Sequence, residues 1–192
     1  MSFAQLKQSI LGRKDRSRKQ NIDDEILTLV EAINQCPSFV TTSSCSGRVL
    51  LYTQSNVNKK NTFEWLFVSH KQVKLIELEA IFQKLPSGLV WFREEAMILH
   101  VCAASVEGAI LLLRLAYSLG FKRSGVISIS PKVILELGST EKVDVPIALD
   151  GSLLVDKQYL SLLVKIANVK LKRNHAKIQK LVKLIYNEVE GK

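Results

Sequence analysis

Residues 123–155 read RSGVISISPKVILELGSTEKVDVPIALDGSLLV, and this stretch decides the fold class. Strands are predicted at 123–130, 132–138, 143–149 and 152–155, and Pro131, Gly138-Ser139 and Asp150-Gly151 supply turn-forming residues between them. No helical pattern separates these strands, so strands and helices do not alternate strictly along the chain. This order favours an α+β domain with a mixed, largely antiparallel sheet over a doubly wound α/β domain.

Further strands and helices are expected on both sides of this stretch. Strands are predicted at 38–42, 48–53 and 64–69, and another pair at 89–93 and 97–102 is expected to be separated by Glu94-Glu95. Helical spacing of apolar residues predicts flanking helices at 3–11, 23–34, 71–84 and 106–118. Ser105 is a suitable N-cap for the last of these helices, and Gly120 is suited to its C-terminal end.

The last predicted element is a long helix from about residue 157 to residue 188. Its apolar residues recur every three, four or seven positions, which predicts one stripe that packs on the body of the protein: Leu160, Val164, Ala167, Leu171, Ile178, Val182, Ile185 and Val189. A second stripe, expected to face away from the body, consists of Lys170, Arg173, Lys177 and Lys180.

Length and composition indicate one folded domain. The chain has 192 residues, of which 47% are apolar, so it has enough apolar surface for a substantial core and is not a disordered protein. We expect a single compact domain over 1–192, with a basic helical segment at 1–34, an α+β body at 35–156 and a long basic helix at 157–189. Three cysteines without a CxxC pair, no secretory leader and no membrane-length apolar run predict a soluble cytoplasmic protein with no membrane partner.

The net charge of +9 is concentrated at the two ends of the chain. Residues 1–20 carry six Lys or Arg against Asp15 alone, and residues 157–192 carry nine against two glutamates. The middle of the chain is therefore slightly acidic. Basic ends on such a body favour binding to a polyanion, most commonly a nucleic acid, although Lys-rich terminal helices are also typical of simple solvated faces.

A polar segment, Thr41–Arg48 (TTSSCSGR), lies between two apolar runs. Hydroxyl and guanidinium groups are poor candidates for burial without partners, so this segment predicts a site for a carboxylate or phosphate ligand. Its Gly47 would allow close backbone approach. Cys45 lacks the arginine six positions later that a cysteine-phosphatase cradle requires, and we interpret it as a small packing residue.

Two histidines fall on predicted strands. His70 closes the run WLFVSH and remains open as either a structural or a catalytic residue, whereas His100 lies inside a strand, where histidines are more often structural. No histidine or cysteine pair has the spacing of a zinc site, so no metal is expected.

Trp91 and Arg93 alternate with Phe92 and should therefore share one face of their strand. An indole beside a guanidinium forms a stacking platform for a flat base next to an anchor for a phosphate. Core packing is the ordinary alternative for any tryptophan.

Five ordered motifs together resemble the family of the third enzyme of wybutosine synthesis, a family of tRNA methyltransferases. The motifs are the polar segment Thr41–Arg48, Trp65–His70, Trp91–His100, Gly120–Gly125 (GFKRSG) and Ala167-Asn168, and the resemblance covers nearly the whole chain. It implies an S-adenosylmethionine-dependent enzyme that methylates a ring nitrogen of the tricyclic demethylwyosine-type base at position 37 of phenylalanine tRNA. It also implies a compact α+β fold unlike the Rossmann methyltransferases, which agrees with the absence of a GxGxxG turn.

The resemblance and the residues together assign candidate roles. Ser43, Ser44, Ser46, Gly47 and Arg48 are expected to hold the methyl donor, Trp91 and Arg93 the tricyclic base, and His70 or His100 to accept a hydrogen bond or proton from the reacting ring. Phosphates of the tRNA are expected to contact basic residues from both ends of the chain, namely Arg13, Lys14, Arg16, Lys19, Lys170, Arg173, Lys177 and Lys180. The alternative class is a non-catalytic RNA-binding module, and a weaker one is a structural protein that binds a partner through the long helix.

Overall fold

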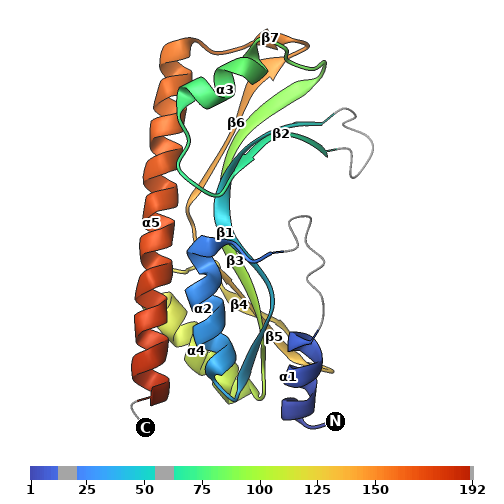
Figure 1. Cartoon of the computed structure of the whole chain (residues 1–192), viewed down its shortest axis with the longest axis vertical. Helices are drawn as coiled ribbons and strands as arrows, with labels where there is room; N and C mark the ends of the chain where they lie inside the picture. Colours follow the sequence, from blue (N-terminus) through green and yellow to red (C-terminus); the bar gives the residue numbers. More distant parts are fainter. Residues whose placement is uncertain (13–20, 55–62, 191–192) are drawn as a thin grey trace. The chain divides into compact units, whose positions relative to one another are not determined.

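The computed structural model describes residues 1–12, 21–54 and 63–190, without side chains at 54, 189 and 190. Five helices and seven strands lie within these ranges (Figure 1). Along the chain they are α1 (Phe3–Leu11), α2 (Asp24–Gln35), β1 (Phe39–Gln54), β2 (Phe63–Ser69), α3 (Leu75–Phe82), β3 (Leu89–Ala103), α4 (Val106–Ser118), β4 (Gly125–Ser128), β5 (Val133–Gly138), β6 (Lys142–Leu149), β7 (Ser152–Leu153) and α5 (Lys157–Glu190). The α+β class and the long C-terminal helix predicted from the sequence are confirmed.

The strands of the described chain are hydrogen-bonded in the order β2-β1-β3-β5-β4, with β6 paired to β3 and β7 paired to β6. The β1–β2, β3–β5, β3–β6, β4–β5 and β6–β7 pairs are antiparallel. Strand β3 is shared along its length: its first half, Leu89–Glu95, pairs with β6, and its second half, Ile98–Ala103, pairs with β5. The expectation of a largely antiparallel sheet is therefore confirmed.

The chain divides into two compact units, each with its own apolar core. Unit 1 consists of Met1–Ser46, Met97–Thr140 and Asn174–Lys192, and unit 2 of Gly47–Ala96 and Glu141–Arg173. Strands β1 and β3 and helix α5 each contribute residues to both units.

The core of unit 1 is formed by apolar residues of α2, α4, the end of α5 and the adjoining strands. Helix α2 begins after Asp23, and the acidic residues Asp24 and Glu25 in its first turn suit the positive end of the helix dipole. Its Ile26, Leu29 and Ile33 are fully buried, which is the spacing of one helical face.

The core of unit 2 combines strand residues with the first half of α5, whose contributions are Leu160, Leu163, Val164, Ala167 and Leu171. An amide of this helix also fixes a loop, because Asn168 accepts a hydrogen bond from the Val73 amide (2.9 Å) and donates one to the Val73 carbonyl (2.7 Å). In the Ala167-Asn168 motif, Ala167 therefore packs in the core of unit 2, and Asn168 holds the backbone at Val73.

Two breaks expected from the sequence are absent. The polar segment Thr41–Arg48 is the middle of the continuous strand β1, and Glu94-Glu95 lies inside the continuous strand β3. The predictions of separate strands on either side of these residues were wrong, because hydroxyl and acidic residues were interpreted as connections. In the structure Glu94 and Glu95 pair with Val143 and Lys142 of β6, directly after the pair of Arg93 with Asp144.

Candidate functional site

The residues predicted to hold the methyl donor lie in the middle of strand β1. Ser43 is exposed, Ser44 and Arg48 are half-buried, and Ser46 and Gly47 are buried. Gly47 has a φ of 96°, a left-handed conformation that other residues rarely adopt, so a glycine is needed there within the strand. The segment therefore presents three accessible polar side chains along one strand, where a loop was expected.

The backbone of Ser46 is held by two polar side chains of unit 1. Its amide donates to Oδ2 of the buried Asp23 at 2.9 Å, and its carbonyl accepts from Nδ2 of Asn174 at 2.7 Å. The same Asn174 accepts a hydrogen bond from the Met97 amide through Oδ1 at 3.0 Å. Asn174 is fully buried, so its one amide joins β1 to β3 inside the protein.

Sequence reasoning missed both of these residues as parts of the site. Asp23 is the first residue of the helix predicted at 23–34, and it was given no role in the site. Asn174 interrupts the buried stripe of α5 between Leu171 and Ile178, and a polar residue at such a position is a signal that could have identified it.

His100 is held between two polar side chains on neighbouring strands of unit 1. Ser43 Oγ lies 2.8 Å from His100 Nδ1, and Glu136 Oε2 lies 2.9 Å from His100 Nε2. The three side chains come from β1, β3 and β5, and all remain partly open to solvent, with side-chain exposures of 31% for His100 and 38% for Glu136. Glu136 was not named from the sequence.

His70 follows directly on the end of β2, as the sequence predicted. Its Nδ1 lies 3.0 Å from the Gly47 carbonyl oxygen in unit 2. Because a carbonyl only accepts hydrogen bonds, Nδ1 carries the hydrogen of this bond, and Nε2 of the neutral ring is then an acceptor.

Arg48 is oriented by a carboxylate and an indole of unit 2. Its Nε donates to Glu95 Oε2 at 2.8 Å, and its guanidinium carbon lies 4.6 Å from the centroid of the Trp65 ring. Trp65 is 40% exposed, so this stacked pair lies at the surface of the unit. A guanidinium held in this way is pre-organised, since its terminal NH₂ groups keep a fixed orientation.

Arg93 forms a bidentate pair with Asp144, at 3.0 Å from Nε and 2.8 Å from Nη2. Burial opposes ionisation of Asp144, but the hydrogen bonds from Arg93 and Lys142 outweigh it and lower the pKa of this carboxyl. The guanidinium carbon of Arg93 lies 4.5 Å from the Tyr52 ring, which stacks on Trp91 with a centroid distance of 6.3 Å and an interplanar angle of 8°. Trp91 and Arg93 thus share a half-exposed face while Phe92 is buried, as predicted.

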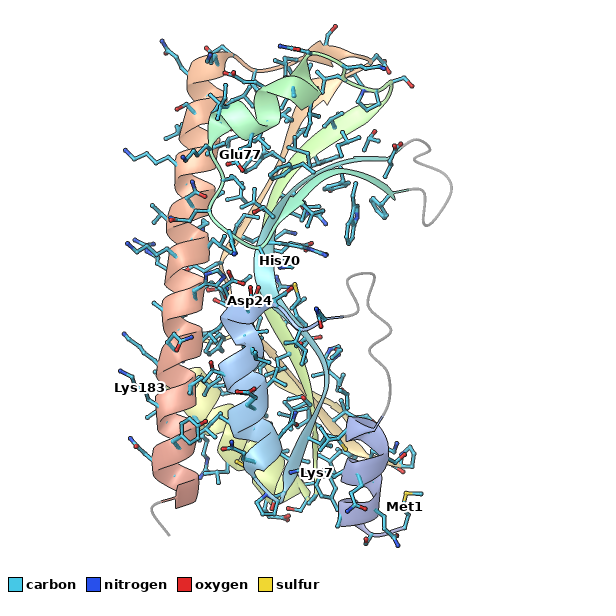
Figure 2. All side chains as sticks on the ribbon, viewed as in Figure 1. Met1, Lys7, Asp24, His70, Glu77 and Lys183 are labelled. Atoms are coloured by element: carbon cyan, nitrogen blue, oxygen red, sulfur yellow. The ribbon has the colours of Figure 1, made fainter. Side chains whose placement is uncertain are left out.

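Of the basic residues predicted on α5, only two are exposed. Arg173 and Lys180 are open to solvent, as are Lys172 and Lys183, and Lys183 is seen projecting from the helix in Figure 2. Lys170 instead pairs with Glu141 at 3.1 Å, and Lys177 donates to Ser139 Oγ at 3.2 Å.

The expectation that all four cations face away from the body was therefore wrong for Lys170 and Lys177. Their long side chains reach back to polar partners beside the strands. The predicted contacts Arg13, Lys14, Arg16 and Lys19 lie outside the described residues.

Glu94 is a fully buried carboxyl in unit 2. Within the described part of the chain the structure records no hydrogen bond to either of its carboxylate oxygens. Burial raises its pKa to about 7, Lys170 opposes that shift, and Glu141 and Glu95 add to it. Glu94 is therefore largely protonated below neutral pH.

This buried carboxyl should make stability depend on pH. Because the pKa of Glu94 is about 7 in the folded chain and 4.5 when unperturbed, its stabilising effect is complete below 4.5 and is lost as the pH rises through about 7. We expect the free energy of unfolding to fall by about 2 kcal/mol between about pH 5 and about pH 8. Urea unfolding at several pH values measures this. Glu94→Gln should remove the decline and the exposed-residue control Glu64→Gln should keep it, so an equal decline in both variants would contradict this role.

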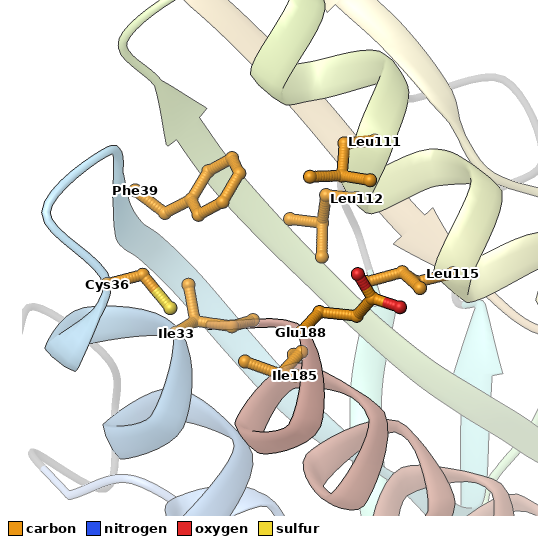
Figure 3. Close-up of a pocket in the computed structure, with 8 residues that line it drawn as sticks. All are labelled: Ile33, Cys36, Phe39, Leu111, Leu112, Leu115, Ile185 and Glu188. Atoms are coloured by element: carbon orange, nitrogen blue, oxygen red, sulfur yellow. The ribbon is translucent and has the colours of Figure 1, made fainter. Parts of the chain in front are cut away.

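Two cavities lie away from these residues. In unit 1 a cavity of about 20 Å³ is lined by Ile33, Cys36, Phe39, Leu111, Leu112, Leu115, Ile185 and Glu188 (Figure 3). It has the volume of about one water molecule and an almost entirely apolar lining, so we expect no ligand there. In unit 2 a cavity of about 290 Å³ lies between Leu75, Phe82 and Leu160, beside the Glu79–Lys157 ion pair. None of the candidate residues lines either cavity.

Among the residues that the structure describes, no helix combines the length and apolarity needed to cross a bilayer.

A sequence model of the family described as "Methyltransferase TYW3" matches residues 3–187. The chain is 37% identical over 178 residues to a protein of Thermococcus sibiricus named tRNA(Phe) 7-((3-amino-3-carboxypropyl)-4-demethylwyosine(37)-N(4))-methyltransferase, covering 92% of this chain and 90% of that protein. It is 34% identical over 194 residues to the tRNA wybutosine-synthesizing protein 3 homolog of Xenopus laevis, covering 98% of this chain and 76% of that protein.

Solved structures agree with these similarities. The PH1069 protein from Pyrococcus horikoshii superposes with a TM-score of 0.89 at 36% identity, covering 96% of both chains. A hypothetical protein from Aeropyrum pernix superposes with a TM-score of 0.75 at 26% identity, covering 88% of this chain and 99% of that one.

Proposed function

Because this chain belongs to the TYW3 methyltransferase family, we propose that it N4-methylates the 7-(3-amino-3-carboxypropyl)-4-demethylwyosine base at position 37 of tRNA(Phe). The observation that carries this proposal is the family match over residues 3–187, together with relatives of that name at 37% and 38% identity over at least 91% of this chain. The protein is then an enzyme of wybutosine and wyosine-derivative synthesis.

The methyl donor of the proposed reaction is S-adenosylmethionine, which supplies an electrophilic methyl group and leaves as a neutral thioether. It carries a carboxylate and ribose hydroxyls, and β1 offers groups that fit them: a guanidinium held in place by Glu95 and the accessible hydroxyl of Ser44. We assign direct contacts with the methyl donor to Ser44 and Arg48, because the Ser43 hydroxyl already contacts His100 Nδ1. We assign no direct contact with the donor to the buried Ser46 and Gly47, which instead determine the shape of the strand at this point.

The aromatic face of unit 2 supports recognition of a flat base. Trp91 lies parallel to Tyr52 and is half-exposed, so part of its indole is available for stacking on a base. Arg93 is fixed by its bidentate pair with Asp144 and contributes a positive charge beside this surface. These contacts favour Trp91 and Arg93 as the residues that hold the tricyclic base.

A proton acceptor completes the chemistry, because a ring nitrogen that bears hydrogen must lose it when it is methylated. Both histidines predicted for this role, His70 and His100, have a ring nitrogen that can accept the proton. His70 is oriented by the Gly47 carbonyl, and His100 by Ser43 and Glu136.

We propose that the exposed cations of α5 bind phosphates of the tRNA. Replacing Lys172, Arg173 and Lys180 together by alanine should weaken tRNA binding and reduce the slope of log affinity against log salt by about 2, because each lost phosphate contact removes about 0.7 to 0.9. The matched control is Lys170→Ala with Lys177→Ala, whose ammonium groups already bind Glu141 and Ser139, and which should change the slope less. Filter binding over a salt series measures both, and equal slopes for all three proteins would remove α5 from the interface.

The function is tested by methyl transfer. We expect the purified protein to transfer a labelled methyl group from S-adenosylmethionine to tRNA(Phe) that carries the unmethylated tricyclic base, and mass spectrometry of position 37 locates the product. tRNA(Phe) with an unmodified guanosine at this position should gain no label. Binding of both tRNAs without any transfer would instead identify a non-catalytic RNA-binding module.

A further inference from the structure

A row of three side chains crosses the sheet of unit 1 with the geometry of a proton relay. Ser43 on β1, His100 on β3 and Glu136 on β5 are linked by contacts of 2.8 Å and 2.9 Å through the two nitrogens of the imidazole ring. Each residue comes from a different strand, and adjacent members of the row face each other across the sheet.

The two contacts determine where the ring hydrogen lies. An ionised carboxylate only accepts hydrogen bonds, so in the neutral ring the hydrogen is on Nε2 and is donated to Glu136. Nδ1 is then an acceptor, and it receives the hydroxyl hydrogen of Ser43. The lone pairs of the exposed Ser43 oxygen remain on the outer end of the row, available to a hydrogen-bond donor from a ligand.

The sheet beside this row is open. Gly125 of β4 lies opposite Glu136, and a side chain added there would meet no atom within 4 Å. Ile98, two residues from His100 on the same face of β3, is 45% exposed. The polar row is thus accessible to the ring N–H of a ligand.

We propose that Ser43 and His100 form a proton relay for the methyl transfer and that Glu136 is the positioning residue that orients the imidazole. This inference rests on the proposed function. As the electron pair of the ring nitrogen forms the bond to the methyl carbon, the carbon–sulfur electrons return to sulfur. The ring N–H proton passes to Ser43 Oγ, whose own hydrogen moves to His100 Nδ1, and Glu136 stabilises the resulting imidazolium.

The relay assigns Ser43 a role that sequence reasoning did not consider. It had been grouped with the donor-binding residues of β1, whereas its contact is to a histidine 57 positions away. It also favours His100 over the strand-end His70 as the proton acceptor, because the carboxylate of Glu136 is aligned to compensate the charge that His100 gains.

Single-turnover kinetics with saturating S-adenosylmethionine and the tRNA(Phe) substrate test the relay. His100→Ala and Ser43→Ala should each lower the rate constant about 100-fold, and Glu136→Ala about 10-fold, all with unchanged affinity for tRNA. Ser43→Thr and Glu136→Asp, which restore a hydroxyl and a carboxylate, should recover part of the loss. The matched control is Glu31→Ala, which removes an exposed carboxylate of α2 and should leave the rate unchanged.

An independent readout is the ¹⁵N NMR signature of the His100 ring, measured without tRNA or methyl donor. In the parent protein the neutral ring should show hydrogen on Nε2, and in Glu136→Ala this preference should be lost. Loss of the preference with an unchanged rate constant, or a slower rate with an unchanged signature, would each overturn the relay. A parent protein that transfers no methyl group while showing the Nε2–H signature would instead overturn the proposed function.

Discussion

Replacing Asn174 by alanine should lower the free energy of unfolding by about 4 kcal/mol. The buried amide of Asn174 satisfies the Met97 amide and the Ser46 carbonyl, at 3.0 Å and 2.7 Å. Alanine would leave both backbone groups buried without this partner, and each such group costs about 1 to 3 kcal/mol. Urea unfolding followed by circular dichroism measures the difference.

The matched control for this substitution is Asn187→Ala, on the same helix but exposed to solvent. Both changes give α5 the same small gain in helix propensity, so the difference between them isolates the buried hydrogen bonds. We expect the control to change stability by about 0.5 kcal/mol or less. Equal stabilities for the two variants would show that Asn174 is not a structural link.

Arg48→Ala should weaken binding of S-adenosylmethionine about 100-fold, since hydrogen bonds to a charged group contribute about 1.5 to 3 kcal/mol. The fold should persist, because Arg48 is half-buried and its partner Glu95 remains within 3.4 Å of Arg93. Isothermal titration calorimetry with the methyl donor measures the affinity. The thermal midpoint of the unliganded variant reports on its fold.

Two further variants make this experiment specific. Arg48→Lys keeps the charge but loses the planar fork of donors, so we expect an intermediate affinity. Arg114→Ala removes an exposed arginine of α4 and should leave the affinity unchanged. If Arg48→Ala binds the donor as tightly as the parent does, the guanidinium has no part in holding it.

The helices were predictable from sequence because their signals are local. The periodic apolar residues of α2, α4 and α5 locate these helices to within a few residues, and Ser105 is the N-cap of α4 with its hydroxyl accepting the Gly108 amide. The succession of short strands after residue 123 was likewise readable from its turn residues, and it determines the α+β class.

The continuity of β1 and β3 could not be predicted, because it depends on partners distant in sequence. Serine, threonine and glutamate clusters are usually solvated connections. Here Asp23 binds the Ser46 amide across 23 positions, and Asn174 binds its carbonyl across 128 positions. Neither contact produces a periodic pattern in the sequence, so the polar segment was interpreted as a loop.

For the candidate site, too, local sequence patterns could be interpreted, whereas contacts between distant residues could not be predicted. Alternation placed Trp91 and Arg93 on one half-exposed face, and their partners Tyr52 and Asp144 come from other strands and were not named. Helical spacing indicated that Lys170 and Lys177 share a side of α5 with Arg173. It could not show that their ammonium groups reach back to other parts of the chain.

Because segments of the two units alternate along the chain, neither unit can be expressed from one continuous part of the gene. Unit 1 is encoded in three separate stretches and unit 2 in two, so no single truncation from either end yields one of them intact. Neither unit can therefore be produced as one contiguous fragment. Half-length expression clones are therefore expected to produce incomplete cores.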